Sequence, residues 1–364
     1  MDAFYASVEL LRYPQLRGVP LVVGGRRASA PGAGSADWPR LRDYVGRGVA
    51  TTASYEARAL GVHSAMGLMK AARLAPDAVL LPADFEQYRQ QSRAFKAALV
   101  AIAPAMEDRS IDEVYLDLTA VPETDTVRLA QTLKDAVQQA TGLRCSIGIS
   151  PNKLLSKIAS DLDKPDGLTV LGMADVPVRI WPLPVRKLHG VGPKAEQRLQ
   201  AIGVHTIGAL AATPPERLQE QFGLSYAQWL HEAAHGRDDR PVVTHSEPRS
   251  ISRETTFERD LDVHHDRAAL TDVLTRLCEQ LAADLERKQV QAGTIGVKVR
   301  FADFQVVTRD RTPARALSSP ADLLAAARSC LRRVTFHQRL RLLGVRASNL
   351  SPGRAPGSVQ GVLA

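Results

Sequence analysis

The chain has 364 residues and a mass of 39.5 kDa, which is too long for one small hydrophobic core and indicates several domains. Its composition is ordinary for a globular protein, and we see neither a membrane-spanning run nor a signal peptide. The three cysteines are far apart, so we expect neither disulfides nor a zinc site, and a reducing cytoplasm is the simplest compartment. The net charge is +8, and residues 287–354 hold fourteen Arg or Lys against three Asp, which favours an anionic partner.

Short strand-like runs alternate with amphipathic helices over residues 1–171 and predict an α/β or α+β domain. The run "PLVVGG" leads into residues 26–47, which have no period and are rich in Gly, Pro and Ala, and we interpret them as a loop or insertion. A helix is predicted from about Tyr55, and a longer one over 85–103. The runs "EVYLDLT" and "CSIGIS" are typical of short strands, and they flank a helix predicted over 125–141.

Residues 172–240 are predicted to be almost wholly helical, and the charged stretch "RDDRPVVTHSEPRS" to be a linker. Beyond it, "TIGVKVRF" alternates, with an apolar face (Ile295, Val297, Val299, Phe301) and a polar one (Thr294, Lys298, Arg300). A second alternation pairs Leu340 and Leu342 with Arg339 and Arg341. We therefore predict an antiparallel sheet that lies on helices and presents a cationic face to a phosphate backbone.

The motif "RSIDEVYLDLT" places two adjacent carboxylates, Asp112 and Glu113, just before a strand-like run. A solvated turn is the simplest interpretation of such a pair. Apolar flanking residues can fix the acids at a sheet edge, however, and close like charges are commonly stabilised by a divalent cation. Together with Asp2, near the start of the chain, they could form a centre with two metal ions about 3.5–4 Å apart.

Cations that suit a triphosphate occur in two helical motifs. In "SYEAR", Tyr55 and Arg58 lie three residues apart, hence on one face of a helix. In "NKLLSKIASDLDKPDG", Lys153, Lys157 and Lys164 follow one another, with Lys164 where the helix should stop. Each of these taken singly could equally be a cation on a helix surface.

The stretch "LHGVGPKAEQRL" contains a glycine-tight turn, Gly190 to Gly192, before Pro193 at the start of a helix. Such a turn exposes backbone N–H groups that suit a DNA phosphate, whereas a plain helical hairpin is the alternative.

Six motifs in chain order together resemble the Y-family DNA polymerases, closest to the bacterial DNA polymerase IV branch: "MDAFYASVE", "SYEAR", "SIDEVYLD", "GISPNKLLSKIASDLDKPDG", "HGVGPKAEQRL" and "SISRETTFERDL". The resemblance implies an α+β multidomain fold, a right-hand polymerase with palm, fingers and thumb plus a C-terminal little-finger domain. By position, it implies a palm (1–4 and 84–171), fingers (5–83, with the insertion 26–47), a thumb with a helix-hairpin-helix (172–240), a linker (241–248), a little finger (249–350) and a flexible tail (351–364).

The resemblance also implies roles for individual residues. Asp112 and Glu113 would be catalytic and, with the backbone carbonyl of Met1, would bind two Mg²⁺ ions, with Mn²⁺ as an alternative. Tyr5 would be the steric gate that excludes a 2′-hydroxyl. Contacts to dNTP would come from Phe4, Tyr55, Arg58 and Lys164. Contacts to DNA would come from Gly190, Val191, Gly192, Lys194, Arg249, Ser250, Ser252, Arg253, Lys298, Arg300, Arg339 and Arg341.

The implied activity is template-directed addition of dNTPs to a primer 3′-hydroxyl, with low fidelity, in translesion synthesis and DNA repair. Its partners would be primer–template DNA and dNTPs, and we expect a monomer in the bacterial cytoplasm, associated with the nucleoid. The final "SVQGVLA" is a degraded form of the peptide with which such enzymes bind the sliding clamp. Family members also carry a strand and a metal-binding Asp before the position of Met1. Because this chain lacks them, the alternative is a catalytically impaired DNA-binding scaffold of the same fold. We also expect that Asp2 is not the principal metal ligand.

Overall fold

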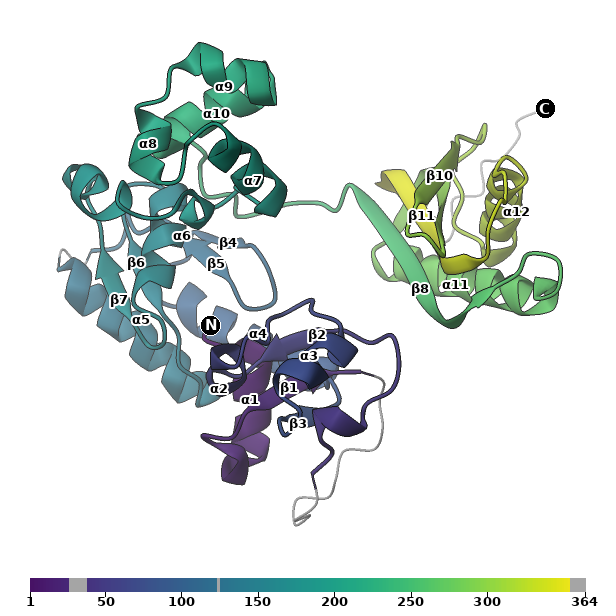
Figure 1. Ribbon diagram of the computed structural model, residues 1–364, viewed down its shortest axis with the longest axis horizontal. Helices are drawn as coiled ribbons and strands as arrows, with labels where there is room; N and C mark the ends of the chain where they lie inside the picture. Colours follow the sequence, from purple (N-terminus) through teal and green to yellow (C-terminus); the bar gives the residue numbers. More distant parts are fainter. Residues whose placement is uncertain (26–37, 123–124, 354–364) are drawn as a thin grey trace, which may run out of the picture. The chain divides into compact units, whose positions relative to one another are not determined.

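The computed structural model describes residues 1–25, 38–122 and 125–353 (Figure 1). The chain divides into two compact units, Met1–His245 and Ser246–Ala364. Both units combine helices with sheets, so the fold is α+β. No helix in the described ranges is both long and apolar enough to cross a membrane. The three cysteines, all described, are free and buried.

The N-terminal unit begins with helix α1 (Phe4–Arg12) and a three-stranded sheet of order β2-β1-β3. Strand β1 runs antiparallel to β2 and parallel to β3. These strands and the two short helices that follow β2 have the bounds β1 Leu21–Gly24, β2 Ala50–Ala53, α2 Tyr55–Ala59, α3 Leu68–Leu74 and β3 Val79–Leu81. The helix predicted from about Tyr55 is thus confirmed, and Ser54 caps it by accepting a hydrogen bond from the Ala57 N–H.

The predicted insertion 26–47 is only partly described, because residues 26–37 lie outside the described ranges. Its remaining part is anchored in the unit, since Trp38 and Leu41 are buried and the Trp38 ring meets Tyr13 edge-on at 5.0 Å. The part of this segment around Trp38 and Leu41 is therefore packed, which the aperiodic sequence did not predict.

The middle of the unit consists of two strand pairs and three helices, with bounds α4 Phe85–Val100, β4 Met106–Asp108, β5 Val114–Leu116, α5 Thr126–Thr141, β6 Ile147–Ile149, α6 Lys153–Leu162 and β7 Leu168–Val170. Strands β4 and β5 form an antiparallel hairpin, while β6 and β7 are parallel. Helix α6 packs closely on β6, because a Cβ at Gly148 would lie 2.3 Å from the Ser156 carbonyl oxygen. The strands and helices predicted here are confirmed.

The predicted helical region 172–240 is confirmed, since it is built from short turns and four helices: α7 Pro193–Ala201, α8 Ile207–Ala211, α9 Pro215–Phe222 and α10 Leu224–Ala234. Figure 1 shows these helices gathered together in one helical region. Leu199, Leu218 and Leu230 from three of them are fully buried in one cluster.

The C-terminal unit is a four-stranded antiparallel sheet of order β10-β9-β11-β8 that packs on two helices. The elements are β8 Ser250–Leu261, α11 Arg267–Arg287, β9 Val290–Phe301, β10 Val306–Arg311, α12 Pro320–Leu331 and β11 Leu340–Pro352. The apolar face predicted for β9 is confirmed, since its four residues are at most 1% exposed. The predicted antiparallel sheet on helices is therefore present.

Three details of this sheet differ from the prediction. Thr294 is buried, and its hydroxyl is satisfied there by a hydrogen bond with the Thr312 hydroxyl and by one that it accepts from the Asn349 amide. The register shifts between Leu340 and Leu342, so Leu343 rather than Leu342 faces the core together with Val299. Strand β11 extends into the predicted tail as far as Pro352, and residues 354–364, with the clamp-binding motif, lie outside the described ranges.

Candidate active site

The turn between β4 and β5 positions Asp112 and Glu113. The N–H groups of Arg109 and Ser110 both donate to the Glu113 carbonyl, at 3.1 and 3.0 Å, and close the hairpin. The Ser110 hydroxyl donates to Asp112 Oδ1 at 2.8 Å. Both acids are half-buried and are fixed by this local geometry, as the apolar flanks predicted.

The first two residues lie against the same hairpin and against β6. The Met1 nitrogen donates to the Asp112 carbonyl at 2.8 Å. Asp2 is 4% exposed, and its carboxylate accepts hydrogen bonds from the Ser146 hydroxyl and from the Asp166 N–H, each at 2.8 Å. Asp2 thus has a structural role, because its carboxylate joins the start of the chain to Ser146 and Asp166.

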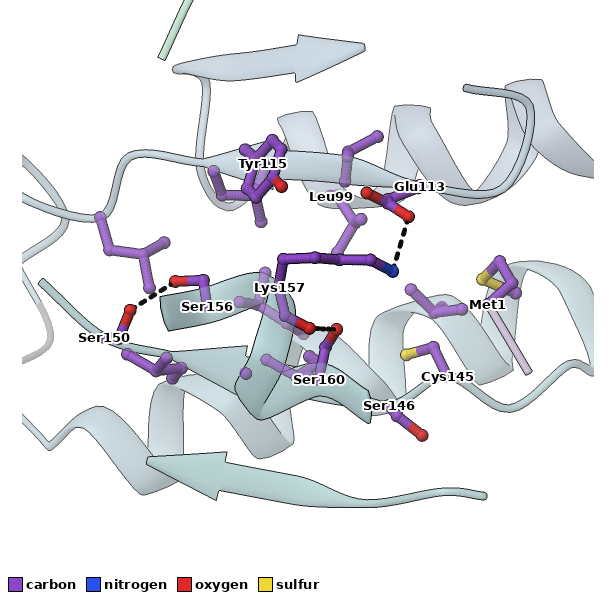
Figure 2. Close-up of a pocket in the computed structure, with 18 of the residues that line it drawn as sticks. Met1, Leu99, Glu113, Tyr115, Cys145, Ser146, Ser150, Ser156, Lys157 and Ser160 are labelled. Atoms are coloured by element: carbon purple, nitrogen blue, oxygen red, sulfur yellow. Dashed lines mark hydrogen bonds and ion pairs between the residues drawn. The ribbon is translucent and has the colours of Figure 1, made fainter. Parts of the chain in front are cut away.

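A cavity of about 420 Å³ opens between the hairpin, β6 and helix α6 (Figure 2). Its lining includes Met1, Asp112, Glu113 and Lys164, so four of the predicted site residues come together there. Lys157, which the sequence suggested only as a phosphate ligand, also lines it and extends toward Glu113. Two carboxylates beside two lysines can bind both a cation and an anion.

A chain of ion pairs runs along one side of the cavity. The Lys157 ammonium lies 2.9 Å from Glu113 and 3.4 Å from Asp161, and Lys164 lies 2.9 Å from the same Asp161. Burial alone would lower the pKa of Lys157, but its hydrogen bond to Glu113 and the charge of Asp161 outweigh burial and raise it. Lys157 is therefore charged at neutral pH and holds Glu113 in place. Nothing in the sequence predicted the ion pair of Lys157 and Glu113.

The donors around the cavity fit a divalent cation, because carboxylate and carbonyl oxygens are the ligands that Mg²⁺ prefers. Within the described ranges, no three side chains of His, Cys, Asp or Glu lie close enough to hold a metal ion together. A cation at this cavity would therefore depend on Asp112, Glu113 and a backbone carbonyl, with oxygens of substrate or water completing its shell.

Phe4 and Tyr5 begin helix α1, so their backbone N–H groups lie in its unpaired first turn. The Phe4 side chain is buried against Phe95, which leaves its backbone for any nucleotide contact. The Tyr5 ring is half-buried, and burial and the nearby Asp112 charge raise its pKa, so its phenol stays neutral.

Tyr55 and Arg58 lie on one face of α2, as predicted, with the guanidinium 5.1 Å from the Tyr55 ring. Burial, together with the charge of Asp2, raises the pKa of Tyr55 to about 12. Its hydroxyl oxygen is buried and has no hydrogen-bond partner in the described structure. A buried hydroxyl without a partner is costly, so this group is available to a ligand.

Lys153 does not join the cavity residues. It forms an ion pair with Glu107 at 2.5 Å, and its ammonium also donates to the Pro241 carbonyl. Glu107 in turn accepts a hydrogen bond from the Val243 N–H at 2.9 Å. Lys153 therefore fastens the first part of the predicted linker to the N-terminal unit.

The turn before α7 is shaped by Gly190, whose φ of +111° is one that side chains rarely adopt. The Val191 N–H donates to the Leu188 carbonyl, so it is not free for a phosphate. Gly192 caps α7, and the first turn of the helix, which includes Lys194, keeps unpaired N–H groups.

Register divides the predicted DNA contacts of the C-terminal unit into two faces. Arg253 pairs with Val345 on the inner face, and its guanidinium binds the Asp284 carboxylate with two hydrogen bonds of 2.5 and 2.7 Å. The Arg253 side chain therefore links β8 to α11, a structural role that competes with its predicted contact with DNA. Ser252, its neighbour, pairs with Arg346 on the outer face.

The outer face is cationic but partly neutralised. Lys298 bonds Glu254 at 2.9 Å, and Arg346, which the sequence analysis missed although it continues the alternation, bonds Asp310 at 3.1 Å. Arg300 is half-buried with an unpartnered Nε, and Arg341 stacks over the Phe304 ring at 4.5 Å. The remaining predicted contacts on this unit are exposed: Arg249, Ser250 and Arg339.

Three family models match the chain. Residues 1–161 match the impB/mucB/samB family, residues 174–204 the HHH motif of that family, and residues 248–361 its C-terminal domain. Among curated proteins, the chain is 40% identical over 353 residues to a DNA polymerase IV of Alkalilimnicola ehrlichii, covering 96% of this chain and 93% of the relative. It is 38% identical over 367 residues to a DNA polymerase IV of Xanthomonas campestris, covering 100% and 96%.

Solved structures agree with these relatives. A Y-family DNA polymerase chimera matches with a TM-score of 0.80 and 25% identity, over 97% of this chain and 98% of that one. An insertion ternary complex of Dbh DNA polymerase matches with a TM-score of 0.66 over the same shares. The chain therefore belongs to the impB/mucB/samB family of Y-family DNA polymerases. Within it, the chain falls in the DNA polymerase IV branch, and it is a DNA-directed DNA polymerase of translesion synthesis and DNA repair.

Proposed function

We propose that the cavity beside the β4–β5 hairpin is the centre where a primer 3′-hydroxyl attacks the α-phosphorus of a template-paired dNTP and releases pyrophosphate. One observation carries this proposal: Asp112, Glu113 and Lys164 line the same cavity with Met1. Positioning and charge stabilisation would do most of the catalytic work, as is usual for phosphoryl transfer.

Asp112, Glu113 and the Met1 carbonyl would hold two divalent cations, Mg²⁺ or Mn²⁺. When bound, such ions supply positive charge near the attacking and leaving oxygens. Asp112 accepts a hydrogen bond from the neutral Ser110 hydroxyl and would offer its carboxylate to a cation. Glu113 forms an ion pair with Lys157, which would release the carboxylate when a cation binds there.

The triphosphate would lie between the start of α1 and the end of α6. The backbone N–H groups of Phe4 and Tyr5, the Tyr55 hydroxyl, Arg58 and Lys164 would contact its oxygens. The unpartnered Tyr55 hydroxyl supports this assignment, because a phosphate oxygen would give it the acceptor it lacks. The Tyr5 ring, near the Asp112 charge, would stand where it can exclude a ribose 2′-hydroxyl.

The remaining regions would act as palm (1–4 and 84–171), fingers (5–83), thumb (172–240), linker (241–248) and little finger (249–350). The thumb would hold a DNA phosphate at Gly190, Gly192 and Lys194, and the outer face of the C-terminal sheet would grip the backbone without reading sequence. We expect low fidelity and action as a monomer in the cytoplasm on primer–template DNA with dNTPs. Contact with a sliding clamp stays a prediction.

The test is primer extension by the purified full chain with Mg²⁺, comparing Asp112→Asn with Asp117→Asn. Asp117 is a matched control because it is an exposed acid at the end of the same hairpin. We expect Asp112→Asn to lower the rate about 10²–10³-fold and the control to keep it, since losing one charge-stabilising group in an active site typically costs that much.

Equal extension by Asp112→Asn and the original chain would overturn the assignment of the centre. DNA binding by the original chain with no extension under any condition would favour the non-catalytic scaffold instead.

A further inference from the structure

The ring of Tyr5 rests on a second tyrosine, which lies outside the cavity lining. Tyr88 of α4 stacks on it with ring centroids 4.3 Å apart and planes 23° apart. Phe85, one turn earlier on α4, meets Tyr5 edge-on at 6.0 Å. Tyr88 is fully buried, so it cannot follow a moving Tyr5 into solvent and instead defines one position for that ring.

Tyr88 is itself fixed by a buried carboxylate. Its hydroxyl donates to Glu9 Oε1 at 2.5 Å, and Glu9 is only 4% exposed. Burial raises the pKa of Tyr88, and the bond to Glu9 raises it further, so the phenol stays protonated and keeps donating. A buried carboxylate without this donor would be costly, which ties the two residues to each other.

Tyr5 and Glu9 lie one turn apart on helix α1. The same helix therefore carries both the Tyr5 ring and the carboxylate that bonds Tyr88, the ring on which Tyr5 stacks. A dNTP and an rNTP differ at this point by one oxygen atom, so a ring that excludes the larger sugar must be held within a fraction of an ångström.

We propose that Tyr88 and Glu9 are positioning residues that hold the Tyr5 ring in place and thereby set how strongly ribonucleotides are excluded. The proposal rests on the steric-gate role of Tyr5 and deepens it. Ordinary packing would also bury a tyrosine and bond it to a glutamate, so the two interpretations must be separated by a readout of sugar discrimination and not by stability alone.

The experiment measures kcat and KM for insertion of one dNTP and of the matching rNTP by the full chain. The variants are Tyr88→Leu, which removes the stacking ring, Tyr88→Phe, which keeps the ring but leaves Glu9 without its donor, and Glu9→Gln. Tyr13→Phe is the matched control, since Tyr13 is a buried tyrosine at the end of the same helix that packs on Trp38. Tyr5→Ala is measured alongside.

We expect Tyr88→Leu to lower the dNTP-to-rNTP ratio of kcat/KM by about tenfold and Tyr88→Phe by about threefold, through a rise in rNTP kcat. Glu9→Gln should fall between the original chain and Tyr88→Phe, because an amide oxygen can still accept the Tyr88 hydroxyl. Tyr13→Phe should keep the original ratio.

If the dNTP-to-rNTP ratio of kcat/KM is unchanged in Tyr88→Leu and Tyr88→Phe but lowered in Tyr5→Ala, the positioning role of Tyr88 is overturned. The steric-gate role of Tyr5 then stands. If that ratio is unchanged in Tyr5→Ala, the steric-gate role of Tyr5 is overturned, and the positioning role of Tyr88 and Glu9 is overturned with it. If Tyr88→Leu does not fold, the more conservative Tyr88→Phe decides. If Tyr13→Phe lowers the dNTP-to-rNTP ratio as much as Tyr88→Phe does, general packing of α1 sets the ratio. That result would also overturn the proposal.

Discussion

Arg253 allows two roles to be distinguished by experiment. The family resemblance implies that it contacts DNA, whereas the strand register places it on the inner face of the sheet, where it stabilises the fold. Its guanidinium binds Asp284, which is 4% exposed and also accepts a hydrogen bond from Arg287 at 2.5 Å. Replacing Arg253 by Ala removes two of the bonds to a buried carboxylate. We predict that Arg253→Ala destabilises the C-terminal unit and leaves DNA affinity nearly unchanged.

The magnitude follows from the surroundings of the pair. Breaking a fully buried ion pair costs about 3–5 kcal/mol in the free energy of unfolding. Here the Arg253 side chain is 43% exposed and Arg287 still neutralises Asp284, so the cost falls to about 2 kcal/mol. In a unit of this size that lowers its melting temperature by about 8 °C.

The assay is urea unfolding of the full chain, with hydrogen exchange in β8 and α11 to assign the loss to the C-terminal unit. DNA affinity is measured over a range of salt concentrations at a temperature where the variant is folded. Arg249→Ala, at an exposed position just before β8, is the matched control for the stability measurement. Unchanged stability, or a salt slope lowered by about 0.9 as for a lost phosphate contact, would refute the structural role of Arg253.

Three other predictions follow from the same structure. Lys298→Ala should lower the log–log salt slope of DNA binding by about 0.9, measured by titration, because one outer-face cation is lost. Gly190→Ala should destabilise the protein by about 2 kcal/mol in urea unfolding, since its Cβ would lie 2.5 Å from Trp229, while Gly192→Ala, with open space, should not. The bond from Arg253 lowers the pKa of Asp284, so its stabilisation is complete above the ordinary value of 3.8 and is lost as pH falls below it. Asp284→Asn should remove that part of the acid sensitivity of unfolding.

Features encoded within a few residues were predictable from the sequence. Adjacent acids before a strand-like run indicated the hairpin turn of Asp112 and Glu113, and three-residue spacing placed Tyr55 beside Arg58. The helical region 172–240 and the apolar face of β9 followed from periodicity alone. In each case the signal and the structure share the same short stretch of chain.

Features that depend on long-range register were not predictable in this way. A one-residue shift in pairing reverses which face a side chain takes, and the shift near Leu342 leaves no mark in the alternation. Lys157 and Glu113 are 44 positions apart, so their pairing exists only once α6 packs against the hairpin. Glu107 and Lys153 likewise meet only through the fold, and a lysine suggested as a phosphate ligand proves to hold a connecting segment.

The ion pairs along one side of the cavity neutralise two of its acids before any ligand binds. Glu113 and Asp161 alternate with Lys157 and Lys164, so each of these two acids lies beside an ammonium group. Such a chain keeps like charges apart without requiring a metal ion for folding, and it leaves each group exchangeable. A cation held by Glu113 would free Lys157, and a phosphate held by Lys164 would free Asp161. Because each exchange lowers the cost of the other, we expect metal and triphosphate to bind this cavity cooperatively.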